Sequence, residues 1–148
     1  MERTKALVSV DEQTFVSRTL FNWLNRFPDK PVGKINFEYL QDRDGMAIST
    51  IQSAYKVRQY ITGDYQAQYP FKVVYRTHPS TNDERLQAEE MLNQIGEWAA
   101  ANYDSLDLGA NKRVVSISRD TAAALFARYE GGMEDYQILM NLTYEVIK

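Results

Sequence analysis

The stretch EGGMEDYQILMNLTYEV, residues 130–146, holds the pattern that decides the fold. Its Gly131-Gly132 pair predicts a tight hairpin turn, because both central residues of such a turn need positive φ angles. Beyond the turn, apolar side chains recur at every second residue, as in a half-buried strand. They are Tyr136, Ile138, Met140, Leu142, Tyr144 and Val146. A long strand that starts at a tight turn indicates an antiparallel sheet.

The segments upstream of this strand continue the sheet and then change to helical spacing. Residues 113–119 and 123–130 each alternate like a strand. Before them, Thr81 and Glu84 stand at capping-box spacing and open a helix that ends near residues 102–104. Its apolar stripe consists of Ala88, Met91, Leu92, Ile95, Trp98 and Ala99. A second capping box, at Ser9 and Glu12, opens a predicted helix over residues 10–26.

Between the helices the sequence predicts further strands. Residues 35–39 alternate, and residues 55–61 and 65–76 read as a hairpin around the turn 62–64. Segment 46–53 fits either a short strand or a docked loop. Pro70 predicts an edge position or a bulge, because proline cannot donate to a ladder. We therefore expect one α+β domain over residues 1–148, a mainly antiparallel sheet with two helices on one face.

The composition excludes most catalytic chemistry. The 148 residues include no cysteine and one histidine, so thiolate metal sites, cysteine nucleophiles and multi-histidine sites are excluded. A general base at His78 would need an orienting acid and a nucleophile nearby. Ser80 and Thr81 are close, but their capping role already explains them, so we interpret His78 as a loop residue. We expect no enzyme activity, no cofactor and no bound metal. No apolar stretch has membrane-spanning length, and the N-terminus lacks a signal-peptide pattern, which predicts a cytoplasmic, non-membrane protein.

The tyrosine content and the basic residues leave alternatives open. Ten tyrosines suit either protein interfaces or strands. Basic side chains interleave with tyrosines along the predicted first hairpin, a pattern that can bind single-stranded nucleic acid. They are Lys56, Arg58, Lys72 and Arg76. The net charge of −3 favours a mixed surface or a charged interface rim instead.

Several segments along nearly the whole chain resemble a known family. They are residues 22–24 (NWL), 35–40 (INFEYL), 60–63 (YITG), 69–73 (YPFKV), 81–85 (TNDER), 95–98 (IGEW), 134–138 (EDYQI) and 142–144 (LTY). In these segments the chain resembles the tail terminator (minor capsid, head–tail joining) proteins of long-tailed phages and prophages. None of these patterns is a catalytic signature.

The resemblance implies a non-enzymatic virion assembly protein. It implies a ring, generally sixfold, that caps the tail tube, stops its polymerisation and joins the tail to the head. The implied partners are further copies of the chain, the major tail tube protein and the head–tail connector protein, with DNA only as passing cargo. The implied location is the virion, after synthesis and assembly in the cytoplasm of the bacterial host. The alternatives are a connector completion protein, or a cytoplasmic ligand- or nucleic-acid-binding α+β module.

The predicted loops 42–45, 62–69 and 130–133 are the candidates for contacts with partners, because loops carry function more often than the elements that they join. Each of these loops is also explained by an ordinary turn. In and beside them we single out Asp42, Arg43, Asp44, Tyr60, Asp64, Tyr65, Tyr69, Tyr129 and Met133.

Overall fold

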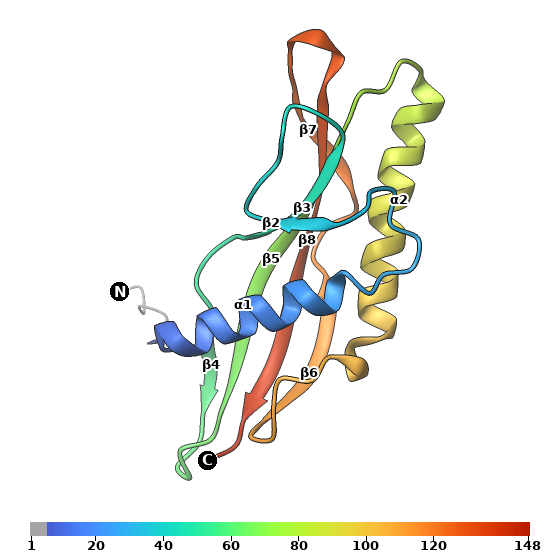
Figure 1. The fold of residues 1–148 in the computed structure, drawn as a ribbon. Helices are drawn as coiled ribbons and strands as arrows, with labels where there is room; N and C mark the ends of the chain where they lie inside the picture. Colours follow the sequence, from blue (N-terminus) through green and yellow to red (C-terminus); the bar gives the residue numbers. More distant parts are fainter. Residues whose placement is uncertain (1–5) are drawn as a thin grey trace.

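Two long strands form the spine of the molecule. The computed structural model describes residues 6–148. Residues 1–5 lie outside the described residues; they belong to the predicted domain and to the N-terminus that was predicted to lack a signal peptide. Strand β5 (Tyr65–Thr77) pairs antiparallel with β8 (Glu134–Val146) along all 13 residues of each strand. At about 3.3 Å per residue, this ladder is roughly 40 Å long and gives the molecule the elongated shape of Figure 1.

Shorter strands complete the sheet on both sides of this spine (Figure 1). The flanking strands are β1 (Ala6–Leu7), β2 (Ile35–Phe37), β3 (Gly45–Thr50), β4 (Tyr55–Gln59), β6 (Lys112–Arg119) and β7 (Ala124–Arg128). On its outer side β5 pairs first with β4 and then with β3, while β8 pairs with β6 and β7. All pairs are antiparallel except β2 with β3. The predicted α+β class and the mainly antiparallel sheet are confirmed.

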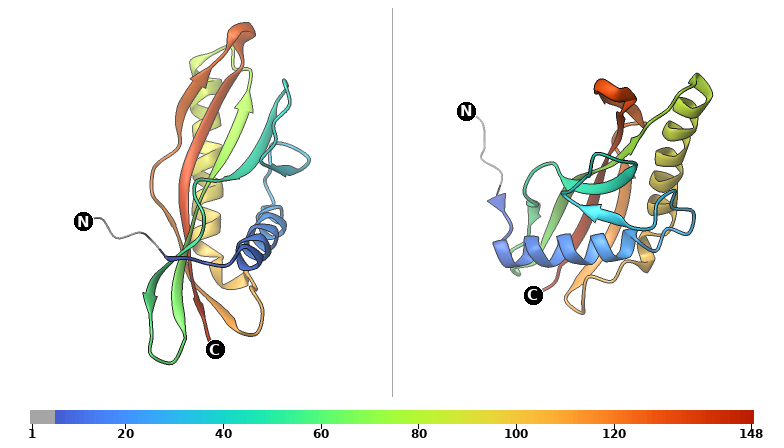
Figure 2. Two further views of the ribbon diagram at one scale, coloured as in Figure 1. Left: turned by 90° about the vertical axis from the view of Figure 1, so that its left-hand side faces the viewer. Right: turned by 45° about the horizontal axis from the view of Figure 1, so that its top comes forward.

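Helices α1 (Val10–Leu24) and α2 (Asn82–Ala101) cover one face of this sheet, as predicted. The alternating apolar side chains of β8 contact both helices: a Cβ on Gly96 of α2 would lie 2.8 Å from Ile138, and the Tyr144 hydroxyl donates to Glu12 of α1 at 2.7 Å. The helices meet at Trp23 and Trp98, whose ring centroids are 4.7 Å apart. In Figure 2, α1 crosses the strands and α2 runs alongside them.

The predicted helix starts are confirmed in detail. The Ser9 hydroxyl accepts a hydrogen bond from the Glu12 amide, and the Thr81 hydroxyl accepts one from the Glu84 amide, each at 3.2 Å. Each bond satisfies one of the amides that a helix N-terminus leaves without a partner. The first helix ends at Leu24, two residues before the predicted end.

The interpretation of Pro70 as an edge or bulge residue is wrong, because β5 lies in the middle of the sheet. The β5 residues up to Gln68 pair with β4, and those from Phe71 pair with β3. Pro70 falls in the gap, and its carbonyl accepts from the Ile51 amide at 3.2 Å. In an antiparallel ladder a residue's N–H and C=O point to the same side. The N–H that proline lacks would therefore face the junction between two strands, and the ladder with β8 loses nothing.

The ambiguous segment 46–53 contains a strand. Strand β3 spans Gly45–Thr50, and the side chains of Met46 and Ile48 are fully buried. The predicted strand 35–39 ends at Phe37, because Glu38 takes a positive φ of 57° and turns the chain. Tyr39 therefore leaves the sheet and is 57% exposed.

Candidate interaction surfaces

The β4–β5 turn forms one end of the molecule, with a fully exposed isoleucine at its tip. The Tyr60 amide donates to the Asp64 carbonyl at 2.9 Å, and the Gly63 amide donates to the Tyr60 carbonyl at 3.0 Å. Gly63 has a φ of 93°, a value that glycine adopts readily. These constraints hold Ile61 out in solvent, where its relative exposure reaches 107%. We call this region, residues 57–64 together with Ile147 and Lys148, the hairpin end.

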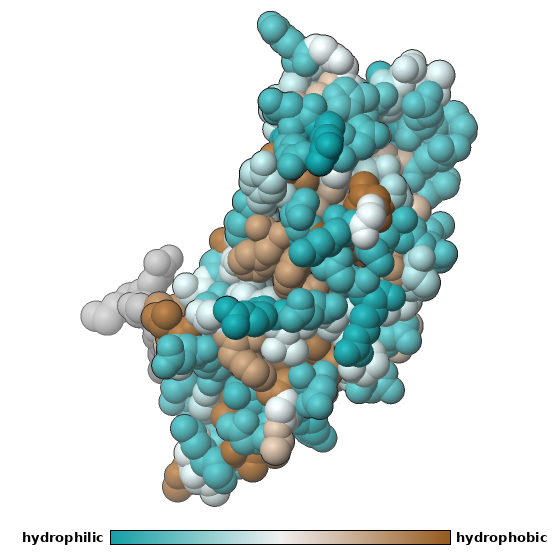
Figure 3. Space-filling view, viewed as in Figure 1, coloured by the Kyte–Doolittle hydropathy of each residue, from teal (hydrophilic) through white to brown (hydrophobic). Residues whose placement is uncertain are grey.

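Other apolar side chains surround Ile61 at the hairpin end. Val57, Tyr60 and Ile147 are between 43% and 51% exposed. The backbone amide of Lys148 donates to the Asp64 carboxylate at 2.7 Å, which fastens the residues after β8 to the turn. Figure 3 shows brown, hydrophobic side chains at this lower end. Exposed apolar side chains that gather in one place indicate a contact surface.

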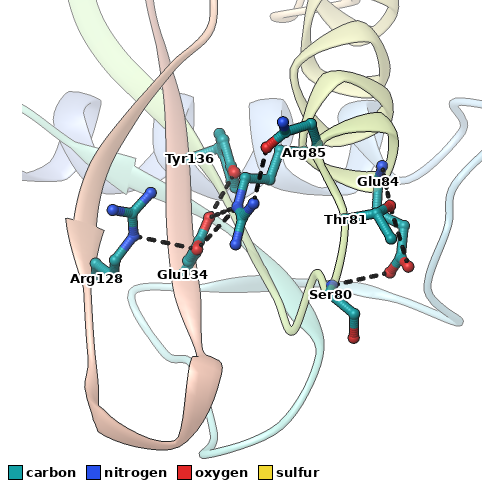
Figure 4. A network of polar contacts seen from close by, with 8 residues as sticks. Ser80, Thr81, Glu84, Arg85, Arg128, Glu134 and Tyr136 are labelled. Atoms are coloured by element: carbon teal, nitrogen blue, oxygen red, sulfur yellow. Dashed lines mark hydrogen bonds and ion pairs between the residues drawn. The ribbon is translucent and has the colours of Figure 1, made fainter.

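The opposite end is built by the β7–β8 hairpin, which two buried carboxylates hold in place. Glu134 and Asp135 are each 2% exposed, and they point to opposite faces of β8. On the helix side, the Glu134 carboxylate accepts from the Tyr136 hydroxyl at 2.7 Å and from Arg85 and Arg128 at 3.2 Å (Figure 4). Three elements, β7, β8 and α2, are thus joined at one carboxylate.

This environment lowers the pKa of the Glu134 carboxyl. Burial alone would raise that pKa, but hydrogen bonds from Tyr136 and Arg85 and the charges of Arg85 and Arg128 outweigh burial. The same hydrogen bond stabilises the neutral phenol: burial, with the bond to Glu134, raises the pKa of Tyr136 to about 12. The carboxylate stays charged and the phenol neutral around pH 7, so the hydrogen bond between them persists.

Asp135 makes the matching network on the open face of the sheet. Its carboxylate receives two hydrogen bonds from Arg76, at 2.7 and 2.8 Å, and one from the Tyr129 hydroxyl at 2.9 Å. The Arg76 guanidinium also lies 5.3 Å from the Tyr129 ring centroid and donates to the Gln41 carbonyl at 3.0 Å. The hydrogen bonds to Asp135 raise the pKa values of Arg76 and of the Tyr129 hydroxyl. This network ties the loop before β3 to the β7–β8 hairpin.

The loop before β3 lines an open groove. Its volume is about 510 Å³, and its lining includes Lys34, Tyr39, Arg43 and Asp44. An Asp44 carboxylate oxygen lies 2.6 Å from Nδ1 of His78, so the loop is fastened to the β5–α2 connection. The lining of the groove is more polar than apolar.

Seven of the nine predicted contact residues fall into three groups on the surface. Asp42, Arg43 and Asp44 are exposed in the loop before β3, and Tyr60 and Asp64 lie at the hairpin end. Tyr129 and Met133 lie at the β7–β8 hairpin, with Tyr129 40% exposed. The structure brings the first and third groups to one end of the sheet and places the second at the other (Figure 1).

The prediction that Tyr65 and Tyr69 lie in a contact loop is wrong. Strand β5 begins at Tyr65, and both rings point into the core, 7% and 0% exposed. The Tyr69 hydroxyl lies 2.7 Å from Ser17 Oγ, and the hydroxyl of Tyr65, like that of Tyr144, donates to Glu12. Burial and the bond to Glu12 raise the pKa of Tyr65. These phenols bind α1 to the sheet.

The basic side chains of the first hairpin are largely engaged within the chain. Arg76 is paired with Asp135, Lys56 Nζ lies 4.4 Å from the Tyr65 ring centroid, and Lys72 Nζ lies 5.5 Å from that of Phe126. Three of the four basic side chains in this predicted pattern therefore contact neighbouring residues of the chain.

Sequence reasoning missed an apolar groove between α1 and β2. It is lined by Phe21 and Phe37, whose ring centroids are 6.0 Å apart, and by Thr14, Ser17, Arg18 and Asn22. The apolar stripe of the predicted helix over residues 10–26 did not indicate this groove, because Phe37 lies on a different element, β2.

No family model matches the sequence, and a comparison with curated proteins gives no match.

Among residues 6–148, no three His, Asp or Glu side chains gather closely enough to hold a metal ion. In the described part of the chain, no helix combines the length and the apolar character needed to cross a bilayer. The structure is an elongated α+β domain whose two ends present candidate contact surfaces of different chemistry.

Proposed function

We propose that the chain is a non-enzymatic virion assembly protein of a long-tailed phage or prophage, a tail terminator. In this role it forms a ring on the finished tail tube, stops tube growth and joins the tail to the head connector. It works in the virion, among copies of itself, the tail tube protein and the connector protein. DNA passes it only as cargo.

The observation that carries this proposal is the hairpin end. A terminator needs one surface for the tube and another for the connector, and the two ends of the sheet offer surfaces of different chemistry. One end exposes Ile61 and its apolar neighbours. The other presents the glycine turn of the β7–β8 hairpin and the charged loop before β3. The β5–β8 ladder joins them rigidly.

Deletion of the gene in an inducible prophage tests the proposal. We expect overlong or headless tails by electron microscopy, and tails of normal length joined to heads would contradict it. Overlong tails separate a terminator from the alternative connector completion protein, whose loss leaves tail length unchanged. A neighbouring gene for the major tail protein would add independent support.

A further inference from the structure

The groove between α1 and β2 is apolar at its base and basic at its rim. Phe21 and Phe37 form the base of a depression of about 410 Å³. Arg18 is part of its lining, and Lys34 Nζ lies 5.4 Å from the Phe21 ring centroid. Arg18 has no carboxylate partner within residues 6–148. An occupant that suits this groove has an apolar side chain flanked by acids.

The solvent side of α2 has this chemistry. Leu86 is 57% exposed. Asp83 precedes it by three residues and Glu90 follows it by four, so both carboxylates lie next to Leu86 on one helix face, one turn away in either direction. Glu97, a further seven residues on, lies on the same helix face and pairs with Arg119 at 3.8 Å; we call this face the α2 stripe. Glu90 has no ion-pair partner in the described chain.

We propose that the α2 stripe of one copy docks into the α1–β2 groove of the next copy. Leu86 packs onto Phe21 and Phe37, and the carboxylates of Asp83 and Glu90 approach Arg18 and Lys34 at the rim. An amphipathic helix laid into an apolar groove is a recurrent mode of recognition. This inference rests on the proposed ring and names the contact that builds it.

A second copy suits the groove because the two surfaces are opposite in shape and in charge. They lie on different sides of one molecule, with α1 and β2 at the front of Figure 1 and α2 along its right-hand side. A contact between two different surfaces is heterologous and repeats from copy to copy, closing into a ring when the rotation per copy allows it. Such repetition makes individually weak contacts strong.

Two other ways of joining copies fit the charges less well. The outer strands carry basic side chains. Arg58 lies on β4, beyond the two residues that pair with β1, and Lys112, Arg119 and Arg128 lie on β6 and β7, where Arg119 and Arg128 pair with Glu97 and Glu134. Cations on both edges disfavour pairing of one edge with another. The apolar hairpin end fits the groove poorly, because the basic Arg58 and Lys148 lie near Ile61 and would meet the basic rim.

Charge reversal in the full chain tests the contact. We expect sedimentation velocity and light scattering to show association that weakens with added salt, as screening requires. Arg18→Glu or Glu90→Lys alone should weaken association about tenfold, and the double variant Arg18→Glu/Glu90→Lys should restore it. Asp120→Lys, a reversal on the exposed connection between β6 and β7, is the matched control and should change nothing. Unchanged association in both single variants, or no recovery in the double variant, would overturn the contact.

Cysteine cross-linking captures the contact even when association is weak. The sequence has no cysteine, so Leu86→Cys/Asn22→Cys places the only two thiols, one on each surface. Mild oxidation should give a ladder of covalent multimers, whereas each single variant should give at most dimers. Absence of the ladder, or cross-linking of the groove to tube protein instead, overturns this inference. The tail phenotype of the deletion tests the proposed function independently.

Discussion

Replacement of Glu134 tests whether one buried carboxylate holds the β7–β8 hairpin to α2. In Glu134→Ala, the Tyr136 hydroxyl, on a residue 1% exposed, loses its acceptor, which costs about 1–3 kcal/mol. Arg85 and Arg128 have side chains 35% and 61% exposed and can turn to water, so their loss adds only about 1 kcal/mol. We expect a total of about 3 kcal/mol. Glu134→Gln keeps an acceptor for Tyr136 and should cost about half as much.

Urea unfolding followed by tryptophan fluorescence measures this difference. With a slope of about 2 kcal/mol per molar urea, the alanine variant should unfold at a midpoint about 1.5 M lower. Glu130→Gln, on the exposed turn of the same hairpin, serves as the control and should stay within about 0.5 kcal/mol of the wild type. Glu134→Ala variants as stable as this control would refute the reasoning.

The pH dependence gives an independent check. Because the folded-state pKa of Glu134 lies below its unfolded value of about 4.3, its stabilisation is complete above that value. It is lost as the pH falls through the folded-state pKa. The stability difference between wild type and Glu134→Gln should therefore shrink in acid. A difference that stays constant down to strongly acidic pH would show that the charge contributes nothing.

Three further predictions concern the core, a phenol and the hairpin end. Gly96→Ala should destabilise the protein by about 1–2 kcal/mol in thermal unfolding. The new Cβ would lie 2.8 Å from Cδ1 of buried Ile138 and 2.7 Å from Cδ of Arg119. Helix propensity alone predicts a more stable variant, and that result would contradict the close packing. In ultraviolet absorbance titration, Tyr136 should ionise near pH 12. Its contribution to the free energy of unfolding should be complete below pH 10 and be lost between pH 10 and 12. If Tyr136→Phe loses stability between pH 10 and 12 just as the wild type does, this reasoning is contradicted. Ile61→Ser should leave urea unfolding within about 0.5 kcal/mol of the wild type but fail to restore normal tails in the deletion strain; full complementation would remove Ile61 from the contact surface.

Local signals made the helices predictable. A capping box joins residues only three positions apart, so Ser9 with Glu12 and Thr81 with Glu84 were visible in the sequence. The alternation of β8 likewise depends on neighbouring residues alone. These signals were enough to give the α+β class and the single helix-covered face.

Features that depend on pairing between distant segments were not predictable. Pro70 looked like an edge residue because the sequence does not reveal that two strands share one side of β5. Tyr65 and Tyr69 looked like loop residues because the turn ends earlier than its polar residues suggest. The second role of Glu12, as acceptor for two buried phenols, requires side chains from β5 and β8 to converge on α1.

The two candidate surfaces also differ in whether the sequence alone could predict them. The hairpin end lies at a turn that the sequence marked, although Ile61 itself was not singled out. The α1–β2 groove joins Phe21 of a helix and Phe37 of a strand, and their proximity depends on how two separate elements pack, which no local pattern reveals.

The central ladder also sets the order in which the chain folds. Strands β5 and β8 are separated in sequence by α2, β6 and β7, so pairing them closes a long loop, which slows folding. Until β8 has been synthesised, β5 has no partner along one whole side, and α1 lacks much of the apolar surface that it covers. A chain that lacks β8 would therefore expose apolar surface of β5 and α1, and exposed surface of this kind favours aggregation.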